Sequence, residues 1–498
     1  MNALSSLYRQ NLSLLTDFYQ LTMVYAAWKS ERDTEKWGVF DLYFRNNPFK
    51  SGYAVSCGLG SVLDFVENFR ISSEDCEYLA TLKGSDGKPL FEKAFLEFLL
   101  KMRLEIDIEA IEEGRIVFSN EPMLRVSGPI WQCQLLETPF LNMMNFETLI
   151  ATKASRVKEA AGDAAVLEFG LRRAQGIDGG LAAARAAYIG GVDATSNILA
   201  GKMFGIPLKG THAHSWVMSY DDETEAFEKF ANAMPGNCIF LVDTYNTIEG
   251  VKHAIQVGLK MKARGQKMLG IRLDSGDLAY LSAEARKLMD EAGLRDAKIV
   301  ASNDLDENLI QDLKFQGAKI DIWGIGTKLV TGYDQPSLGG VFKLVAMKDS
   351  RESTEWKYRI KLSEQIAKVT TPGVHQVRRF YNADSLLGDM IYDERNAPDK
   401  NSQVIVDPLD STRRKEFEPN TAYEDLLKPV VRNGKVIKTE TRGAAEVLSE
   451  IRDRRKRDMD RLHPTIRRFL NPHSYPVGLE LGLHNQKSEM ILERRGFK

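Results

Sequence analysis

The chain has 498 residues and a formal net charge of −2, from 67 basic and 69 acidic side chains. This balance gives no general attraction to nucleic acid or to an anionic membrane. No apolar run approaches the ~20 residues that span a bilayer, no signal peptide is evident, and four scattered cysteines fit neither a zinc site nor a disulfide framework. We therefore expect a cytoplasmic globular protein of more than one domain.

The first part of the chain, residues 1–145, is predicted to be an α+β segment. An N-terminal helix is followed by short apolar segments, and residues 108–128 alternate between apolar and polar side chains around turns. Such alternation is typical of antiparallel strands with one solvated face. We expect this segment to flank the domain formed by the middle of the chain.

The middle of the chain, residues 146–348, alternates between short apolar runs and amphipathic helical stretches. Buried parallel strands give such continuous apolar runs, and their alternation with helices indicates βαβ units. This predicts an α/β fold, an irregular (β/α) barrel, with an open doubly wound sheet as the alternative. The expected strands are 165–170, 206–211, 238–244, 267–274, 297–303, 319–326 and 341–347, with a weaker one at 191–194.

The last part, residues 349–498, is again rich in strands and turns and ends in a charged helix from about Ala444. We expect it to pack with the N-terminal segment. The basic stretch Arg452–Phe469 could be a nucleic-acid patch, but aspartates interrupt it, so we interpret it as a solvated helix face.

Polar residues concentrate where the predicted strands end. In barrels the active site is built at the carboxyl ends of the strands. Every expected strand end in this region carries charge, hydroxyl or glycine, which is the strongest functional signal in the residues themselves. The candidates are Arg172, Asp243, Arg272, Asp274, Ser302, Asn303, Gly324, Gly326 and Thr327.

Two of these strand ends point to an anion. The sequence GIGTK at 324–328 has the composition of a phosphate cradle, in which glycines let backbone N–H groups approach an anion, although it could also be a simple turn. Arg272 on a buried strand needs a partner, which could be a structural carboxylate or a bound anion. We expect Ser275 to cap the following helix.

The remaining candidates allow both a structural and a functional reading. His212 and His214 lie two positions apart on an extended segment, so they face the same side. A core or capping role and acid–base or nucleophilic work are about equally supported, and no third ligand favours a metal pair. Phe169 could be an aromatic platform or a core residue.

Together these motifs resemble the nicotinate phosphoribosyltransferase family. The resemblance runs in order from Leu14 to the segment NPHSYPVGL near the C-terminus. Its blocks are LLTDFYQLTM, FDLYFRNNPF, EFGLRRAQGIDGGLAAARAAYIGGVDATSN, GTHAHSWVMSY, IRLDSGDL, ASNDLDE, GIGTKLVT and QPSLGGVFKLV.

The resemblance implies a type II phosphoribosyltransferase fold, with an irregular barrel and an α+β domain made from both chain ends. It implies transfer of phosphoribose from 5-phosphoribosyl-1-pyrophosphate to nicotinate in NAD salvage, with Mg²⁺ and coupled ATP hydrolysis. The family's phosphorylated histidine matches His214, whereas the role of His212 stays open. A homodimer with shared active sites is also implied.

Further residue roles follow from the same resemblance. Asp274 is similar to the family residue near the ribose, where its charge would favour an oxocarbenium-like transition state. Nicotinate would stack between Phe169 and Tyr19, with its carboxylate met by Arg272 and Thr211. Arg172 is similar to a clamp on either the pyrophosphate side or the base side. Asp193 and Asp243 also match family positions, and Arg45 and Lys343 match as contacts of pyrophosphate or ATP. The residues expected to hold the phosphoribosyl group are Arg172, Asp243, Ser302, Asn303, Gly324, Gly326 and Thr327.

Three alternatives remain at this point. A nicotinamide phosphoribosyltransferase would share the strand-end pattern but must satisfy an amide instead of a carboxylate. A non-catalytic ligand-binding protein on the same fold would have no need for His214, Arg272, Asp274 and the GIGT loop together. An aldolase-type barrel would need a Schiff-base lysine or a metal site at a strand end, and no strand end offers one clearly.

Overall fold

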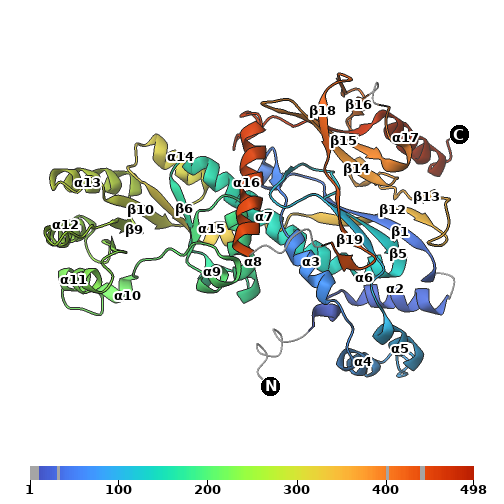
Figure 1. Ribbon diagram of the computed structural model, residues 1–498, viewed down its shortest axis with the longest axis horizontal. Coiled ribbons are helices and arrows are strands. Elements are labelled where there is room, and N and C mark those ends of the chain that lie inside the picture. Colours follow the sequence, from blue (N-terminus) through green and yellow to red (C-terminus); the bar gives the residue numbers. More distant parts are fainter. Residues whose placement is uncertain (1–10, 31–33, 400–402, 438–443, 498) are drawn as a thin grey trace. The chain divides into compact units, whose positions relative to one another are not determined.

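The computed structural model describes residues 11–30, 34–399, 403–437 and 444–497. The chain forms two compact units, one made of Met1–Thr148, Ser337–Thr441 and Arg457–Lys498, and the other of Leu149–Pro336 and Arg442–Lys456. Figure 1 labels their helices and strands. Among the described residues, no helix is long and apolar enough to cross a membrane.

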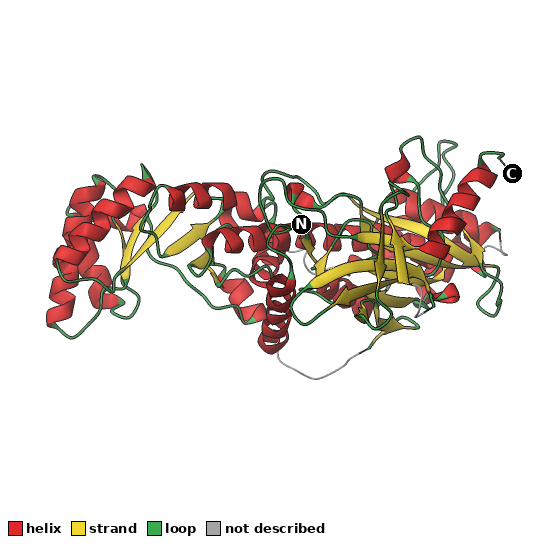
Figure 2. Ribbon diagram, turned by 90° about the horizontal axis from the view of Figure 1, so that it is seen from above, coloured by secondary structure: helices red, strands yellow, loops and turns green. Residues whose placement is uncertain are grey.

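The second unit is built on a six-stranded sheet in the order β7-β6-β11-β10-β9-β8, in which every pair is parallel. Its central strands are short apolar runs that are largely buried, as expected for a parallel sheet covered by helices. Figure 2 shows these strands among helices. The strands are β6 (Ala165–Glu168), β7 (Ala194–Thr195), β8 (Ile239–Leu241), β9 (Gly270–Leu273), β10 (Lys298–Asn303) and β11 (Ile322–Ile325).

Several helices of this unit begin at side-chain caps. Asp222, Asn246, Asp277 and Asp306 each accept a hydrogen bond from a backbone N–H of the first turn of their helix. Such caps satisfy donors that the helix itself leaves unpaired. The elements are η4 (Leu171–Arg173), α8 (Ile177–Ile189), α9 (Ile198–Phe204), α10 (His214–Val217), α11 (Glu223–Ala233), α12 (Thr247–Ala263), α13 (Leu278–Glu291), α14 (Glu307–Phe315) and α15 (Thr327–Val330). The helix α7 (Glu137–Ala161) precedes them.

Two of the expected parallel strands are wrong. Residues 206–211 make only an isolated bridge between Leu208 and Thr195, since Pro207 lacks a backbone donor and most of this run is exposed. Residues 341–347 belong to β12 (Gly340–Lys348), which pairs antiparallel with β1 (Trp37–Phe44) in the first unit. An apolar run indicates a buried strand but does not show which sheet the strand joins.

The first unit contains segments from both ends of the chain in one sheet, in the order β13-β12-β1-β5-β3-β19-β20, all antiparallel. The expected antiparallel pairing within residues 108–128 is confirmed by β3 and β5. A second sheet has the order β17-β16-β21-β15-β14-β18, and β2 pairs with β4.

The remaining elements of the first unit are as follows. The strands are β2 (Ala54–Val55), β3 (Asp107–Ala110), β4 (Ile116–Val117), β5 (Leu124–Pro129), β13 (Lys357–Tyr358), β14 (His375–Tyr381), β15 (Leu386–Asp393), β16 (Gln403–Val406), β17 (Arg414–Phe417), β18 (Ala422–Asp425), β19 (Lys428–Arg432), β20 (Lys435–Val436) and β21 (Val477–Glu480). The helices are η1 (Leu12–Leu14), α2 (Phe18–Lys29), η3 (Pro48–Lys50), α3 (Leu59–Asn68), α4 (Ser73–Ala80), α5 (Lys93–Lys101), α6 (Ile130–Leu135), η5 (Ile366–Lys368), η6 (Glu394–Asn396) and α17 (Leu481–Arg494).

The charged helix near the C-terminus is confirmed as α16 (Ala444–Arg461), but it is not simply solvated. Arg452 donates to the backbone carbonyls of Gly191 and Val192, and Arg455, which is buried, donates to Ser155. The interpretation of the basic stretch as a solvated face is therefore wrong for these two arginines, because both donate hydrogen bonds to residues far away in the sequence.

Candidate active site

The carboxyl ends of the parallel strands in the second unit surround a pocket with a cavity volume of about 400 Å³. The loops after β6, β9, β10 and β11 line this pocket, together with residues 210–214. Of the residues predicted from the sequence, the pocket brings together Phe169, Arg172, Thr211, His212, His214, Arg272, Asp274, Ser302, Asn303, Gly324, Gly326 and Thr327.

An aromatic ring lies against bare backbone at one wall of the pocket. A Cβ atom at Gly324 would lie 2.8 Å from two ring carbons of Phe169, so only glycine permits this contact. Behind it, the buried Glu168 accepts hydrogen bonds from the Gly170 backbone N–H and from Thr195 Oγ1. Burial raises the pKa of Glu168. Phe169 is only half-buried, so its ring is part of the pocket surface as well as of the packing.

Arg272 places a half-buried guanidinium at the end of β9. Its Nη2 donates to the backbone carbonyl of His212 at 3.1 Å, whereas its buried Nε has no hydrogen-bond partner among the described residues. Burial lowers the pKa of Arg272; Asp274 and Asp243 oppose this effect, and Arg172 adds to it. No carboxylate of the described residues forms an ion pair with this side chain. The site therefore holds a positive charge that is only partly satisfied.

Carboxylates occupy the neighbouring positions. Asp243 Oδ2 accepts hydrogen bonds from the Asp274 backbone N–H at 2.8 Å and from Ser275 Oγ at 2.7 Å. Its other oxygen, Oδ1, is buried without a hydrogen-bond partner among the described residues. Ser302 Oγ donates to Asp274 Oδ1. The predicted capping role of Ser275 is wrong, because Asp277 caps α13 and Ser275 instead holds Asp243.

The two histidines have different environments although they face the same side in the sequence pattern. The Leu241 backbone N–H donates to His212 Nε2 at 3.3 Å, and the rings of Phe227, Phe230 and Phe240 surround the imidazole. Burial lowers the pKa of His212 to about 4, so the ring is neutral near pH 7. His212 is thus a core residue whose carbonyl anchors Arg272.

His214 is more exposed and offers both ring nitrogens to polar partners. Its Nδ1 lies 3.2 Å from Thr244 Oγ1, and its Nε2 lies 3.9 Å from Asp274 Oδ2. The Thr244 hydroxyl can accept from Nδ1–H, and this tautomer leaves the Nε2 lone pair free. Such an imidazole can act as a nucleophile or as a base.

Some sequence candidates lie outside this pocket. Tyr19 is about half exposed on α2 of the first unit, and Arg45 and Lys343, which are weaker matches to the family, belong to that unit too. Asp193, another family match, pairs with Arg452 and Lys158 and does not line the pocket.

Sequence reasoning missed several residues of the site. Ser196 and Asp304 line the pocket, and Thr244 contacts His214. Each directly follows or adjoins a residue at a strand end, so position could have indicated them. The contribution of Glu168 could not have been found in this way, since it depends on a hydrogen bond from Thr195 of the neighbouring strand β7. Arg173, which the sequence places at the same strand end as Arg172, also lines the pocket.

The parallel sheet and the polar, arginine-containing pocket at its strand ends define an α/β enzyme that acts on small molecules. Three family models match the chain: the nicotinate phosphoribosyltransferase N-terminal domain at residues 14–145, the nicotinate phosphoribosyltransferase family at 164–384 and the C-terminal domain at 374–487. The chain belongs to the nicotinate phosphoribosyltransferase family.

Individual relatives agree with this assignment. The chain is 42% identical to nicotinate phosphoribosyltransferase of Bacillus subtilis over 97% of its own length and 96% of that protein. It is similar to the crystal structure of the human nicotinic acid phosphoribosyltransferase, with a TM-score of 0.81 and 31% identity over 95% of this chain and 99% of the other. The Pyrococcus furiosus nicotinate-nucleotide pyrophosphorylase shares the fold, with a TM-score of 0.66 at 21% identity over 90% of this chain and 96% of the other.

Proposed function

We propose that this protein transfers phosphoribose from 5-phosphoribosyl-1-pyrophosphate to the ring nitrogen of nicotinate. The nitrogen lone pair forms the bond to C1 of the ribose while the bond from C1 to pyrophosphate breaks, giving nicotinate mononucleotide and pyrophosphate. The observation that carries the proposal is Arg272, whose half-buried guanidinium lacks an ion-pair partner among the described residues. A bound carboxylate would accept its hydrogen bonds and balance its charge, whereas the amide of nicotinamide carries no charge to balance it.

Nicotinate would bind with its ring on Phe169 and its carboxylate on Arg272 and Thr211. The close contact between Phe169 and Gly324 supports this arrangement, because it fixes the plane of the aromatic platform. Tyr19 of the partner subunit would cover the other face of the ring. Its exposure on α2 leaves it available for such a contact.

The phosphoribosyl group would occupy the other strand ends. Its 5′-phosphate would accept hydrogen bonds from the loops with Ser302 and Asn303 and with Gly324, Gly326 and Thr327. Arg172 would hold the pyrophosphate, and Asp243 would fix the loop that carries Asp274. Asp274 would then stabilise positive charge that develops on the ribose as pyrophosphate leaves.

Magnesium fits the chemistry of this pocket. Mg²⁺ prefers oxygen ligands and is usually held by one or two carboxylates together with substrate phosphates. The Asp274 carboxylate, which lines the pocket, offers such oxygens. Asp243 does not line the pocket but is bonded to the Asp274 backbone N–H, and its Oδ1 is a buried acceptor without a hydrogen-bond partner in the described part of the chain. When bound, the ion would offset negative charge on the pyrophosphate.

ATP would act through His214. With Nδ1–H donated to Thr244, the Nε2 lone pair would attack the γ-phosphorus of ATP, forming an N–P bond as the bond to the bridging oxygen breaks and ADP leaves. The added negative charge can promote turnover only if it favours the substrate-binding form.

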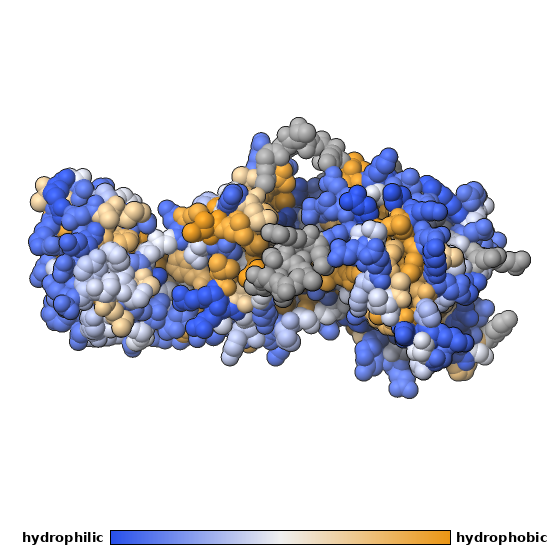
Figure 3. All heavy atoms as spheres, turned by 90° about the horizontal axis from the view of Figure 1, so that it is seen from below, coloured by the Kyte–Doolittle hydropathy of each residue, from blue (hydrophilic) through white to orange (hydrophobic). Residues whose placement is uncertain are grey.

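A homodimer in the cytoplasm would complete the site. The residues Ile198, Leu199 and Met203 on α9 are apolar and exposed, which supports a protein contact there. Ser196, two residues before α9, lines the pocket, so this contact would lie near it. Hydrophobic side chains gather on this unit in the view of Figure 3, on the side where Figure 1 places α9. The parallel sheet would represent the irregular barrel of the family, and the second unit, whose Leu149–Pro336 make up most of the predicted range 146–348, would be the catalytic domain. The first unit, which contains most of the predicted flanking ranges 1–145 and 349–498, would be the α+β domain.

The test measures pyrophosphate release from 5-phosphoribosyl-1-pyrophosphate and Mg²⁺, with nicotinate or nicotinamide and with or without ATP. We expect turnover with nicotinate, stimulation by ATP, and loss of this stimulation in His214→Ala but not in His463→Ala, which changes an exposed histidine of the first unit. Turnover with nicotinamide alone would overturn the assignment of Arg272. Binding of both substrates without turnover would indicate a non-catalytic protein.

A further inference from the structure

A largely buried ion pair of the second unit joins two of the loops that form the strand-end pocket. Lys328 Nζ lies 2.6 Å from Asp306 Oδ2, and the two side chains are only 23% and 9% exposed. Lys328 directly follows Thr327, which lines the pocket, but neither Lys328 nor Asp306 lines it. The amine of this lysine is thus directed to a carboxylate of the protein and not to the open pocket.

Asp306 uses both of its carboxylate oxygens. Its Oδ1 accepts a hydrogen bond from the Leu309 backbone N–H at 2.8 Å and so caps α14, while its Oδ2 accepts from Lys328. The loop between β10 and this cap contains Asn303 and Asp304, which line the pocket. Fixing Asp306 therefore fixes one end of this loop, because strand β10 already fixes the other.

The loops after β10 and β11 leave neighbouring strands at the same edge of the sheet. In the parallel ladder of these two strands, the last pair is Asn303 with Ile325. Beyond this point the Lys328–Asp306 pair connects the chain that follows β11 with the chain that follows β10. The ion pair therefore holds the two loops together where the ladder has ended.

A second lysine, on α7, supports the same arrangement from behind. Lys153 Nζ, which is completely buried, lies 2.8 Å from Glu307 Oε2 at the start of α14 and 2.6 Å from Asp334 Oδ2 in the segment after α15. Arg156 Nε lies 2.8 Å from Glu307 Oε1. Within this network of charges, Lys328 is the member that directly follows a pocket residue, so its contact acts closest to the site.

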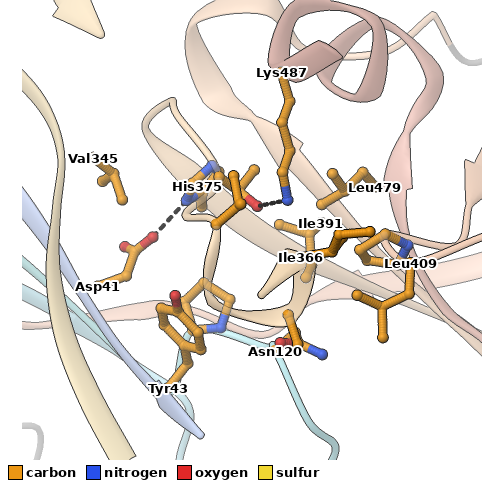
Figure 4. A pocket seen from close by; sticks show the side chains of 15 residues that line it. Asp41, Tyr43, Asn120, Val345, Ile366, His375, Ile391, Leu409, Leu479 and Lys487 are labelled. Atoms are coloured by element: carbon orange, nitrogen blue, oxygen red, sulfur yellow. Dashed lines mark hydrogen bonds and ion pairs between the residues drawn. The ribbon is translucent and has the colours of Figure 1, made fainter. Parts of the chain in front are cut away.

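The pair keeps both of its members charged. Burial acts to lower the pKa of Lys328, but the hydrogen bond and the charge of Asp306 raise it overall. Burial acts to raise the pKa of Asp306, but its hydrogen bonds and the nearby lysine charges lower it overall. Lys487 of the first unit is the contrast: its amine donates to the Thr371 hydroxyl at 3.2 Å, and burial lowers its pKa to about 8 (Figure 4).

We propose that Lys328 is a positioning residue for the phosphate of the phosphoribosyl substrate. By pairing with Asp306, it keeps the loops after β10 and β11 at the spacing that their donors need to bind one phosphate together. Loops that are already in place lose less conformational freedom when the ligand binds, which increases affinity. This inference rests on the proposed function, which assigns these two loops to the 5′-phosphate of 5-phosphoribosyl-1-pyrophosphate.

Steady-state kinetics of Lys328→Met, Asp306→Asn and the double variant test the proposal, in the full-length protein with Mg²⁺, ATP and saturating nicotinate. Methionine keeps most of the aliphatic chain, and asparagine keeps the helix cap, because Asn and Asp are about equally good caps. Each single variant should raise the KM for 5-phosphoribosyl-1-pyrophosphate about 10-fold, with little change in kcat or in the KM for nicotinate. The double variant should be no worse than the worse single variant, and Lys328→Arg, which keeps the charge, should stay near the wild-type KM.

The chain offers a matched control at the other end of the same strands. Lys298, the first residue of β10, lies 3.1 Å from Asp321, which directly precedes β11. This ion pair joins the amino ends of the two strands, away from the pocket. Lys298→Met and Asp321→Asn should therefore leave the KM for 5-phosphoribosyl-1-pyrophosphate unchanged, even if they lower the urea midpoint.

Three results would overturn the proposal. A much larger KM increase in Lys328→Met than in Asp306→Asn, with additive effects in the double variant, would mean that Lys328 itself contacts the phosphate. An active wild-type protein whose KM is unchanged in both single variants, or raised equally in the control variants, would refute the positioning role and leave the proposed function intact. A wild-type protein that neither binds nor turns over 5-phosphoribosyl-1-pyrophosphate would refute the proposed function and this inference together.

Discussion

Two arginines, the fully buried Arg379 of the first unit and the half-buried Arg272 of the second, show how differently the protein uses the same side chain. Arg379 on β14 is completely buried and forms hydrogen bonds to both oxygens of Asp389, with Asp458 as a further partner at 3.4 Å. Tyr475 donates to Asp389 Oδ1 at 2.8 Å and completes the network. Arg272, in contrast, has a backbone carbonyl as its partner and an unsatisfied Nε.

The electrostatic consequences have opposite signs. Burial alone would lower the pKa of Arg379, but the charge and hydrogen bonds of Asp389 raise it well above its ordinary value. At Arg272 burial prevails and the pKa is lowered. When a buried charge has a full set of partners, removing any one of them is destabilising. When it lacks partners, its burial costs free energy until a ligand supplies the opposite charge. The comparison therefore predicts that Arg379 is a structural arginine and that Arg272 binds a ligand.

The largest effect is expected from breaking the structural pair. Arg379→Met leaves the Asp389 carboxylate buried without its cation, and removal of one partner of a buried pair costs about 3–5 kcal/mol. Urea denaturation should therefore show a much lower midpoint. Arg70→Met, at an exposed arginine of the same unit, should change the midpoint little. A small effect at Arg379 would mean that its network contributes no more than a surface pair.

Arg272→Gln should give the opposite pattern. Removing an unsatisfied buried charge should not destabilise the protein, but it should lower kcat/KM for nicotinate by about 100-fold, equivalent to about 3 kcal/mol of lost transition-state stabilisation. Steady-state kinetics and urea denaturation of the same preparation measure both effects. Arg295→Gln, at an exposed arginine of the second unit, is the matched control. A lower urea midpoint together with an unchanged kcat/KM for nicotinate would contradict the binding role.

His212 extends the comparison to acid pH. Burial holds its folded-state pKa at about 4, below the ordinary value of 6.5, so the unfolded chain binds the proton more readily. Stability should therefore fall as the pH drops from about 6.5 to 4, by up to about 3 kcal/mol. His212→Asn should remove this pH dependence, at the cost of some packing. His463→Asn, at an exposed histidine, should keep the wild-type profile.

The sequence predicted the residues of the pocket better than their partners. Arg272, Asp274, Ser302 and Gly324 each stand at a strand end, and parallel strands bring their carboxyl ends to one edge, so local position was sufficient. The core role of His212 was not predictable, because it depends on three phenylalanines from α11 and β8.

Strand pairing was harder to predict for a related reason. Residues 341–347 have the same apolar pattern as the parallel strands, yet they pair with β1 from the other end of the chain. Burial determines the pattern, and burial is similar in both sheets. The cap of α13 shows the same limit, since Ser275 and Asp277 are equally suitable residues and only the backbone conformation decides between them.

The smallest expected effect compares two buried hydroxyls of the second unit. Ser302 Oγ donates to Asp274 in the pocket, whereas Ser282 Oγ donates to the Ala279 carbonyl and accepts from the Lys319 backbone N–H. Each bond contributes about 1 kcal/mol. Ser302→Ala should therefore lower kcat/KM for 5-phosphoribosyl-1-pyrophosphate several-fold with little change in the urea midpoint, and Ser282→Ala should do the reverse. If both variants lose the same amount of stability and their activity falls in proportion to that loss, Ser302 is a structural residue like Ser282. The orientation of Asp274 must then depend on the hydrogen bond from its backbone N–H to Asp243 alone.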